Sequence, residues 1–312
     1  MTFEETYFGM WNKAVQEVLR NKSTYRRIEK AIGNPESSLT DKIKSFDQDL
    51  REYAVEWDKI SNMHNRNSVY RRIVDFIGEQ KGFLIDIGCG NGNFVAEWGN
   101  VPALGVDLNG YCLQLAEKNL KERGFPVKRY SDSTLSFNYD KGFDVKPLGG
   151  ELHLDEITLL NDDINNLNIT KQALKQHNVK ADIATFMLFG GNPYELSPMY
   201  FLNQRTPSFQ NLFQKRSGLH LTKYYIMGQL PYILQRGGSF YLGVRLNPLT
   251  EKIISNIGTI EDMFNDLARF HGGVKRVEKI PIQRETGIGN IKVRGLLNDD
   301  GLLYVAEFEI RK

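Results

Sequence analysis

Cysteine is scarce in this sequence, which has only Cys89 and Cys112 among its 312 residues. Two cysteines in a chain of this length exclude a disulfide framework and fit a reducing compartment. Neither sign of charge dominates, because 40 lysines and arginines face 38 acidic residues. Nucleic-acid-binding domains are usually strongly basic, so this balance gives no sign of a general nucleic-acid binder and leaves only a local basic face open.

Long apolar runs are also missing. No stretch reaches the ~18 apolar residues that span a bilayer, and the first ten residues carry Glu4 and Glu5 where a leader peptide is basic and then apolar. We therefore expect a soluble, cytoplasmic protein without a membrane partner. None of the five histidines pairs with another histidine, a cysteine or a carboxylate at metal-ligand spacing, so no metal site is predicted.

The first 80 residues have apolar positions at helical spacing and no strand-like alternation. We predict that Thr40 caps one helix that runs through about Trp57 and that Ser68 caps another that runs through Ile77. Residues 1–80 are therefore interpreted as a helical segment, a lid or substrate segment, and residues 81–312 as the main domain.

Short apolar runs alternate with amphipathic stretches in the main domain. This alternation predicts parallel strands joined by helical crossovers. The predicted strands are 83–87, 103–106, 157–160, 181–189 and 238–244, and the predicted helices are 94–98, 113–122, 219–235 and 260–270.

Two further segments depart from this alternation. Strand candidates at 274–282, 291–297 and 302–310 follow one another closely, with a hairpin turn at 298–301 between the last two. We expect an antiparallel hairpin that closes a parallel sheet. Residues 125–155 are too long for a plain loop and are predicted to form an inserted hairpin.

The segment LIDIGCGNGNF, residues 84–94, carries the strongest chemical signal. A buried strand runs into glycines at alternate positions, Gly88, Gly90 and Gly92, and then into a helix. Glycine adopts positive φ and lets a ligand approach the backbone, and the helix start offers free amides. The spacing lacks the Gly-x-Gly-x-x-Gly offset of the dinucleotide fingerprint, so a nicotinamide oxidoreductase is a weak alternative.

Carboxylates stand at the ends of the next two predicted strands. Asp107 ends the second strand, where a carboxylate can accept both hydroxyls of a ribose. Asp162 and Asp163 follow the third strand, where a carboxylate can hold an adenine amino group. Acidic residues are also common at helix starts, so a capping role stays open for all three.

Together these segments resemble the class I S-adenosylmethionine-dependent methyltransferases, and residues 86–92 are close to that family's first motif. The resemblance implies a seven-stranded, mostly parallel Rossmann-like sheet with an antiparallel last strand, and S-adenosylmethionine as the cofactor. It places the glycines around the methionine part, Asp107 on the ribose, and Asp163 in preference to Asp162 by the adenine. The expected cofactor-binding residues are Asp86, Gly88, Cys89, Gly90, Gly92, Asp107, Leu108, Asp162, Asp163 and Phe186.

Two of these residues have a structural alternative. Asp86 either supports the glycine turn or the amino group of the cofactor, or is a buried structural carboxylate. Cys89 is expected to pack as a small residue in the turn, because no base is matched to it for catalysis.

The candidate acceptor loop follows the fourth strand. Asn192-Pro193-Tyr194 resembles the Asn-Pro-Pro-Tyr motif of amino-group methyltransferases but lacks the second proline. The resemblance implies that Asn192 holds the target nitrogen and that Tyr194 stacks on a planar group; a tight turn is the alternative. A general base is optional in methyl transfer. His64 and His153 are the histidines to test, because the helical segment and the insertion are expected to cover the site, and His153 is the predicted catalytic residue.

We therefore expect a methyltransferase that transfers a methyl group to a small-molecule acceptor by in-line displacement, because two covering segments favour a closed pocket. One alternative is an RNA or DNA methyltransferase that uses the loop of Asn192 and Tyr194. The other is a non-catalytic, cofactor-binding subunit. Nothing in the sequence indicates the acceptor atom or the oligomeric state.

Overall fold

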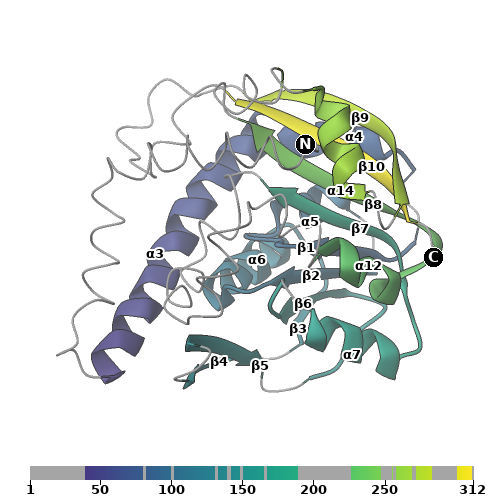
Figure 1. Cartoon of the computed structure of the whole chain (residues 1–312). Helices are drawn as coiled ribbons and strands as arrows, with labels where there is room; N and C mark the ends of the chain where they lie inside the picture. Colours follow the sequence, from purple (N-terminus) through teal and green to yellow (C-terminus); the bar gives the residue numbers. More distant parts are fainter. Residues whose placement is uncertain are drawn as a thin grey trace.

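A large twisted sheet forms the centre of the molecule (Figure 1). The computed structural model describes residues 39–79, 82–99, 102–130, 133–138, 142–147, 150–164, 167–188, 226–246, 255, 258–268, 272–282 and 301–310. The eight strands of this sheet are β1 (Leu84–Ile87), β2 (Ala103–Asp107), β3 (Val127–Arg129), β6 (Ile157–Asn161), β7 (Ala181–Leu188), β8 (Leu234–Leu246), β9 (Gly272–Ile282) and β10 (Gly301–Ile310). Their order across the sheet is β3-β6-β2-β1-β7-β8-β10-β9.

Neighbouring strands in the run β3-β6-β2-β1-β7-β8 pair in parallel, whereas β10 is antiparallel to both of its neighbours, β8 and β9. The mostly parallel sheet with an antiparallel C-terminal hairpin is therefore confirmed. The expected number of seven strands is wrong, because β3 adds an eighth strand beside β6. This strand has three residues, of which only Val127 is buried, so it leaves no periodic signal in the sequence.

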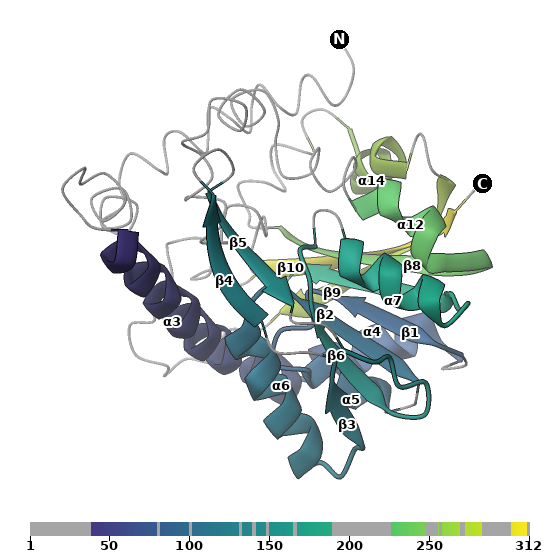
Figure 2. The ribbon, with the colours of Figure 1, turned by 90° about the horizontal axis from the view of Figure 1, so that it is seen from below.

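Helices cover both faces of the sheet, so the central strands are apolar on both sides. The helices α4 (Val69–Ile77), α5 (Asn93–Trp98) and α6 (Gly110–Glu122) share one buried cluster with the sheet. The helices α7 (Asn168–Gln176), α12 (Gly228–Ile233) and α14 (Ile260–Ala268) share the other. Helix α3 (Leu39–Arg66) lies outside these layers, along α4, α5 and α6 (Figure 2).

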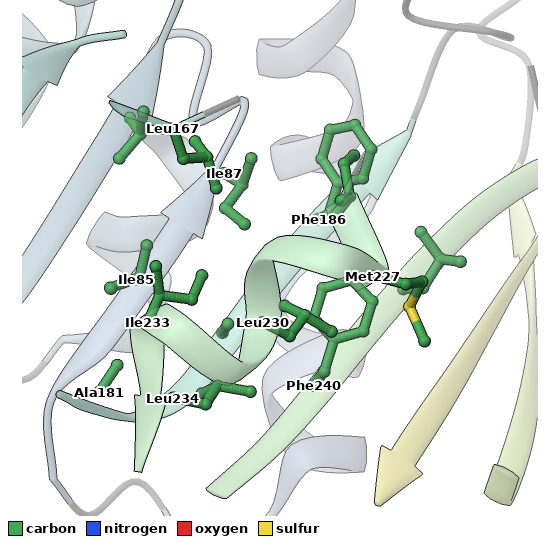
Figure 3. Close-up of a cluster of buried hydrophobic side chains, with 14 of the residues drawn as sticks. Ile85, Ile87, Leu167, Ala181, Phe186, Met227, Leu230, Ile233, Leu234 and Phe240 are labelled. Atoms are coloured by element: carbon green, nitrogen blue, oxygen red, sulfur yellow. The ribbon is translucent and has the colours of Figure 1, made fainter. Parts of the chain in front are cut away.

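The packing beneath β1 is shown in Figure 3, where side chains of α12 lie against the central strands. Leu230 and Ile233 are fully buried in the same cluster as Ile85 of β1 and Phe240 of β8. Burial of a large aliphatic side chain contributes about 1.5–3 kcal/mol. This packing holds β1 in place, and the turn that follows β1 begins from a fixed strand.

Several expected boundaries differ from the structure. The helix predicted over 219–235 ends at Ile233, because the chain is already extended at Leu234 and pairs there with Ala181. Helix α3 continues to Arg66, beyond its expected end. Ser68 precedes α4 in a left-handed conformation and makes no side-chain capping hydrogen bond. The strand predicted over 291–297 lies outside the described residues.

An antiparallel hairpin lies within the segment 125–155. Its strands are β4 (Ser133–Asn138) and β5 (Gly142–Pro147), which form a separate two-stranded sheet. The division of the chain at residue 80 stays a prediction. Within the described ranges, no helix combines the length and the apolarity needed to cross a membrane.

Candidate cofactor-binding site

The glycine turn follows β1 at the carboxyl edge of the sheet. The chain passes from β1 to β2 on one side and returns later to β7 on the other, which makes this edge the topological switch point where ligands of such sheets bind. Gly88, Gly90 and Gly92 have φ values of 73°, 55° and 75°, a region that favours glycine. The N–H groups of Gly88 and Cys89 both donate to the carbonyl oxygen of Val106 in β2, at 2.7 and 3.0 Å.

Each glycine of this turn faces a different element. A Cβ at Gly88 would lie 3.3 Å from the ring of Phe186 in β7, and one at Gly92 would press on α6. A Cβ at Gly90 would collide with the indole nitrogen of Trp57 in α3. The turn is therefore enclosed on three sides. Phe186 lies beside it and also belongs to the core, and its role in cofactor binding stays a prediction.

Asp107 lies directly at the glycine turn. Its Oδ2 accepts the Gly90 N–H at 2.9 Å and its Oδ1 accepts the Asn109 N–H at 2.8 Å. Burial raises the pKa of Asp107 to about 6, against the lowering effect of these backbone amides. A carboxylate has about four acceptor positions, so this one keeps capacity for further hydroxyl donors.

Asp162 and Asp163 differ in their surroundings. Asp162 is buried, its Oδ1 accepts the Asp163 N–H at 2.9 Å, and its Oδ2 accepts both the N–H and the hydroxyl of Thr170 at 2.8 Å. Burial raises the pKa of Asp162 to about 6. Asp162 thus binds the first turns of α7, and the half-buried Asp163 remains the better candidate for an adenine contact.

Asn161 ties the ends of two strands together, and sequence reasoning did not single it out. Its Nδ2 donates to the carbonyl oxygens of Asp107 and Leu108, at 2.9 and 2.8 Å. The backbone around Leu108, a predicted cofactor-binding residue, is therefore held beside β6. A short polar residue at the end of an apolar strand is the only signal that the sequence offers for this role.

Asp86 lies on β1, immediately before the turn, and is 2% exposed. Its Oδ1 accepts the hydroxyl of Thr185 at 2.7 Å. Burial raises the pKa of Asp86 to about 7, the Thr185 hydrogen bond opposes this, and the charge of Asp107 adds to it. The two carboxylates therefore flank the glycine turn from β1 and β2.

The side chain of Cys89 is buried against β2. A Cβ placed on Gly105 of β2 would lie 3.1 Å from the Cys89 Sγ, so the thiol packs against that strand. Burial is the largest cause that raises the pKa of the Cys89 thiol well above its usual value. A thiol of this kind is a poor nucleophile, and within the turn it donates to the carbonyl oxygen of Gly90 at 4.0 Å.

Of the three predicted catalytic residues, the structure describes His153 alone. Asn192 and Tyr194 lie outside the described residues. The backbone of His153 exchanges hydrogen bonds of 3.2 Å with the hydroxyl of Thr158, the second residue of β6. That position is near the amino end of the strand, three residues or about 10 Å from the carboxyl edge where the glycine turn lies.

A buried polar network joins the turn to α3, and sequence reasoning missed it. The Ser61 hydroxyl donates to Asn91 Oδ1 at 2.6 Å, and Asn91 Nδ2 donates to Asp58 Oδ1 at 2.7 Å. Asn93 Nδ2 donates to Ser61 Oγ at 3.0 Å and to Asn62 Oδ1 at 2.9 Å. Polar residues on the inner face of a helix were its only trace in the sequence. Among the described residues, no group of three or more histidine, cysteine or acidic side chains is placed to hold a metal ion.

Comparison with models of known protein families finds no match, and comparison with curated proteins finds none either. Among solved structures, the chain is similar to magnesium protoporphyrin IX methyltransferase (ChlM) from Synechocystis PCC 6803 with bound SAH, at 11% identity over 94% of this chain and 95% of that chain, with a TM-score of 0.40. It is also similar to the N-methyltransferase NodS from Bradyrhizobium japonicum WM9, at 13% identity over 80% of this chain and 96% of that chain, with a TM-score of 0.40. These likenesses concern the fold, and the functional interpretation rests on the residues of the site.

Proposed function

We propose that this protein is an S-adenosylmethionine-dependent methyltransferase that binds its cofactor at the carboxyl ends of β1, β2 and β6. The observation that supports this most directly is the hydrogen bond from the Gly90 N–H to Asp107 Oδ2. This bond fixes the carboxylate of Asp107, which stands at the strand end where a ribose is bound in such folds, against the glycine turn.

The donors and acceptors around the turn fit such a cofactor. Asp107 keeps acceptor capacity for the ribose hydroxyls, because backbone N–H groups such as those of Gly90 and Asn109 use only part of its about four acceptor positions. Asp86 offers a second carboxylate beside the turn for a cationic amino group. Asp163 is the candidate for the adenine amino group, since Asp162 is occupied by α7.

The cofactor supplies a methyl group that is already activated by its sulfonium, so this chain needs only to bind, orient and exclude water. Helix α3 lies against the glycine turn and covers it from outside the sheet. This cover favours a small acceptor molecule in a closed pocket. Asn192 and Tyr194 remain the predicted acceptor loop.

The experiment is calorimetric binding of S-adenosylhomocysteine and S-adenosylmethionine to the wild type, to Asp107→Ala and to Asp75→Ala. Removal of a hydrogen-bonding charge at Asp107 is expected to weaken a micromolar affinity by about 2 kcal/mol, or about 30-fold. Asp75, an exposed carboxylate of α4 with 59% of its side chain accessible, is the matched control and is expected to leave the affinity unchanged. A folded wild type that binds neither ligand contradicts the proposal, and nicotinamide cofactors are then tested.

A second experiment identifies the acceptor. The protein is incubated with radiolabelled S-adenosylmethionine and cell extract, which is then separated into small molecules, nucleic acid and protein. Label in small molecules is the expected result. Label in RNA or DNA, together with salt-sensitive binding, favours the nucleic-acid alternative. Binding of the cofactor with no label transferred favours a non-catalytic subunit.

A further inference from the structure

Helix α3 presents one continuous inner face to the rest of the molecule. Leu50, Ala54, Ser61 and His64 are buried along it, at intervals of three to four residues or multiples of them, and Trp57 lies half-buried in the middle. This spacing is that of one helix face. Buried residues on both sides of Trp57 therefore fix its position against the rest of the molecule.

Trp57 meets the glycine turn at its central glycine. The indole nitrogen occupies the space that a side chain at position 90 would need, whereas the other two glycines face β7 and α6. Gly90 is also the residue whose N–H holds the carboxylate of Asp107. Trp57 and Asp107 therefore approach the same glycine, one from α3 and the other from β2.

On the C-terminal side of Trp57, the polar network fixes α3 to the turn. The single proton of Ser61 goes to Asn91 Oδ1, which carries none of its own. The Tyr70 hydroxyl, 2.6 Å from Ser61 Oγ, must therefore be the donor in that pair. Ser61 is thus fully satisfied while it is 1% exposed. Buried networks in which every member is satisfied are rigid. The network therefore favours one position of α3 relative to the glycine turn.

On the N-terminal side of Trp57, two hydrogen bonds join α3 to the start of α6. Asn109 Nδ2 donates to the carbonyl oxygen of Leu50 at 2.8 Å, and the Tyr111 hydroxyl donates to Asp47 Oδ1 at 2.8 Å. Asn109 also places its N–H on Asp107 Oδ1. The same residue therefore holds both the predicted ribose carboxylate and the covering helix.

We propose that Trp57 forms a wall of the cofactor pocket on its ribose side and contacts the bound cofactor directly. This inference rests on the proposed function, because it requires the cofactor at the glycine turn. An indole offers a large apolar face and one N–H donor, which suits a surface between an adenosine and water. Its anchoring on both sides means that the wall is preformed rather than assembled from a loose loop.

The test combines tryptophan fluorescence with calorimetry of S-adenosylhomocysteine binding, on the full chain. The variants are Trp57→Phe and Trp57→Ala, and the control is Val55→Ala, which alters a 49% exposed residue on the same helix. We expect the ligand to change the emission of the wild type and of Val55→Ala, and to leave that of Trp57→Phe unchanged. We also expect Trp57→Ala to weaken binding at least tenfold, with Trp57→Phe within about threefold of the wild type.

The outcomes separate this inference from the proposed function. Suppose that the wild type binds the ligand, that Trp57→Ala binds equally well and that Trp57→Phe keeps the full emission change. The inference about Trp57 is then contradicted, and the methyltransferase proposal stands. Should the folded wild type bind no ligand, both are overturned. If Trp57→Ala fails to fold, the emission of Trp57→Phe decides alone, because that variant keeps an aromatic ring in the same place.

Discussion

Asp86 makes a prediction about stability that runs against the usual effect of changing a buried hydrogen-bonded residue. Burial raises its pKa from 3.8 to about 7, and one pKa unit corresponds to about 1.4 kcal/mol. Because the folded state binds this proton more tightly than the unfolded state, the contribution of Asp86 to stability is complete below pH 3.8. It is lost as the pH rises through the window from 3.8 to about 7.

The perturbation is Asp86→Asn, which keeps an oxygen to accept the Thr185 hydroxyl and removes the ionisable group. With the two pKa values above, ionisation of Asp86 costs about 2–3 kcal/mol more at pH 8 than at pH 5. The variant is therefore expected to gain about 2–3 kcal/mol relative to the wild type between these two pH values. Any fixed cost of the new amide is the same at both pH values and cancels in the difference.

The assay is urea denaturation of both proteins at pH 5 and pH 8. The free energy of unfolding of the variant minus that of the wild type is compared between the two pH values. Asp75→Asn on the exposed surface of α4 is the control and is expected to show no pH-dependent gain. A gain below about 0.5 kcal/mol for Asp86→Asn refutes the reasoning, because the buried carboxylate then costs little to ionise. A gain at pH 8 accompanied by weaker cofactor binding indicates that Asp86 is retained for function at the expense of stability.

Three further predictions concern the turn and its supports. Gly90→Ala places a Cβ at φ 55° and against Trp57; we expect it to weaken S-adenosylhomocysteine binding at least tenfold by calorimetry and to destabilise the fold by about 1–3 kcal/mol. Thr170→Val removes the hydroxyl donor of the buried Asp162 and is expected to cost about 2 kcal/mol in urea denaturation, whereas Thr170→Ser retains the hydroxyl and most of the stability. Asn91→Ala leaves several polar partners in α3 unsatisfied, and the free energy of unfolding is expected to fall by about 2–3 kcal/mol in the same assay. A fall below about 0.5 kcal/mol contradicts the role of the network.

The parts of the fold that could be predicted are those with a strong local signal. The strand before the glycine turn is buried at every position, so its sequence is a continuous apolar run interrupted only by Asp86. The turn needs residues that adopt positive φ, which only alternate glycines announce clearly. Asp107 could be placed beside the turn because the carboxyl ends of neighbouring parallel strands meet at one edge.

The parts that could not be predicted depend on tertiary contacts. Trp57 and Ser61 lie in helix α3, and periodicity in its sequence predicts an apolar face. The same periodicity does not predict which part of the molecule that face covers. The position of His153 follows from the path of the insertion back to the amino end of β6, which periodicity does not record. The early start of β8 at Leu234 depends on its pairing with Ala181, because the segment that follows, residues 235–238 with two glycines, has no strand character of its own.

The insertion of β10 between β8 and β9 has a consequence for synthesis on the ribosome. Domains begin to fold as the chain emerges, at about 5–20 residues per second, yet β8 and β9 do not touch as neighbours and both wait for residues 301–310. Until that strand arrives, each of them presents an unpaired edge of main-chain donors and acceptors, the kind of surface that templates aggregation. The nascent chain is therefore vulnerable until residues 301–310 have emerged, and a truncation before residue 301 leaves the glycine turn encoded but the sheet divided.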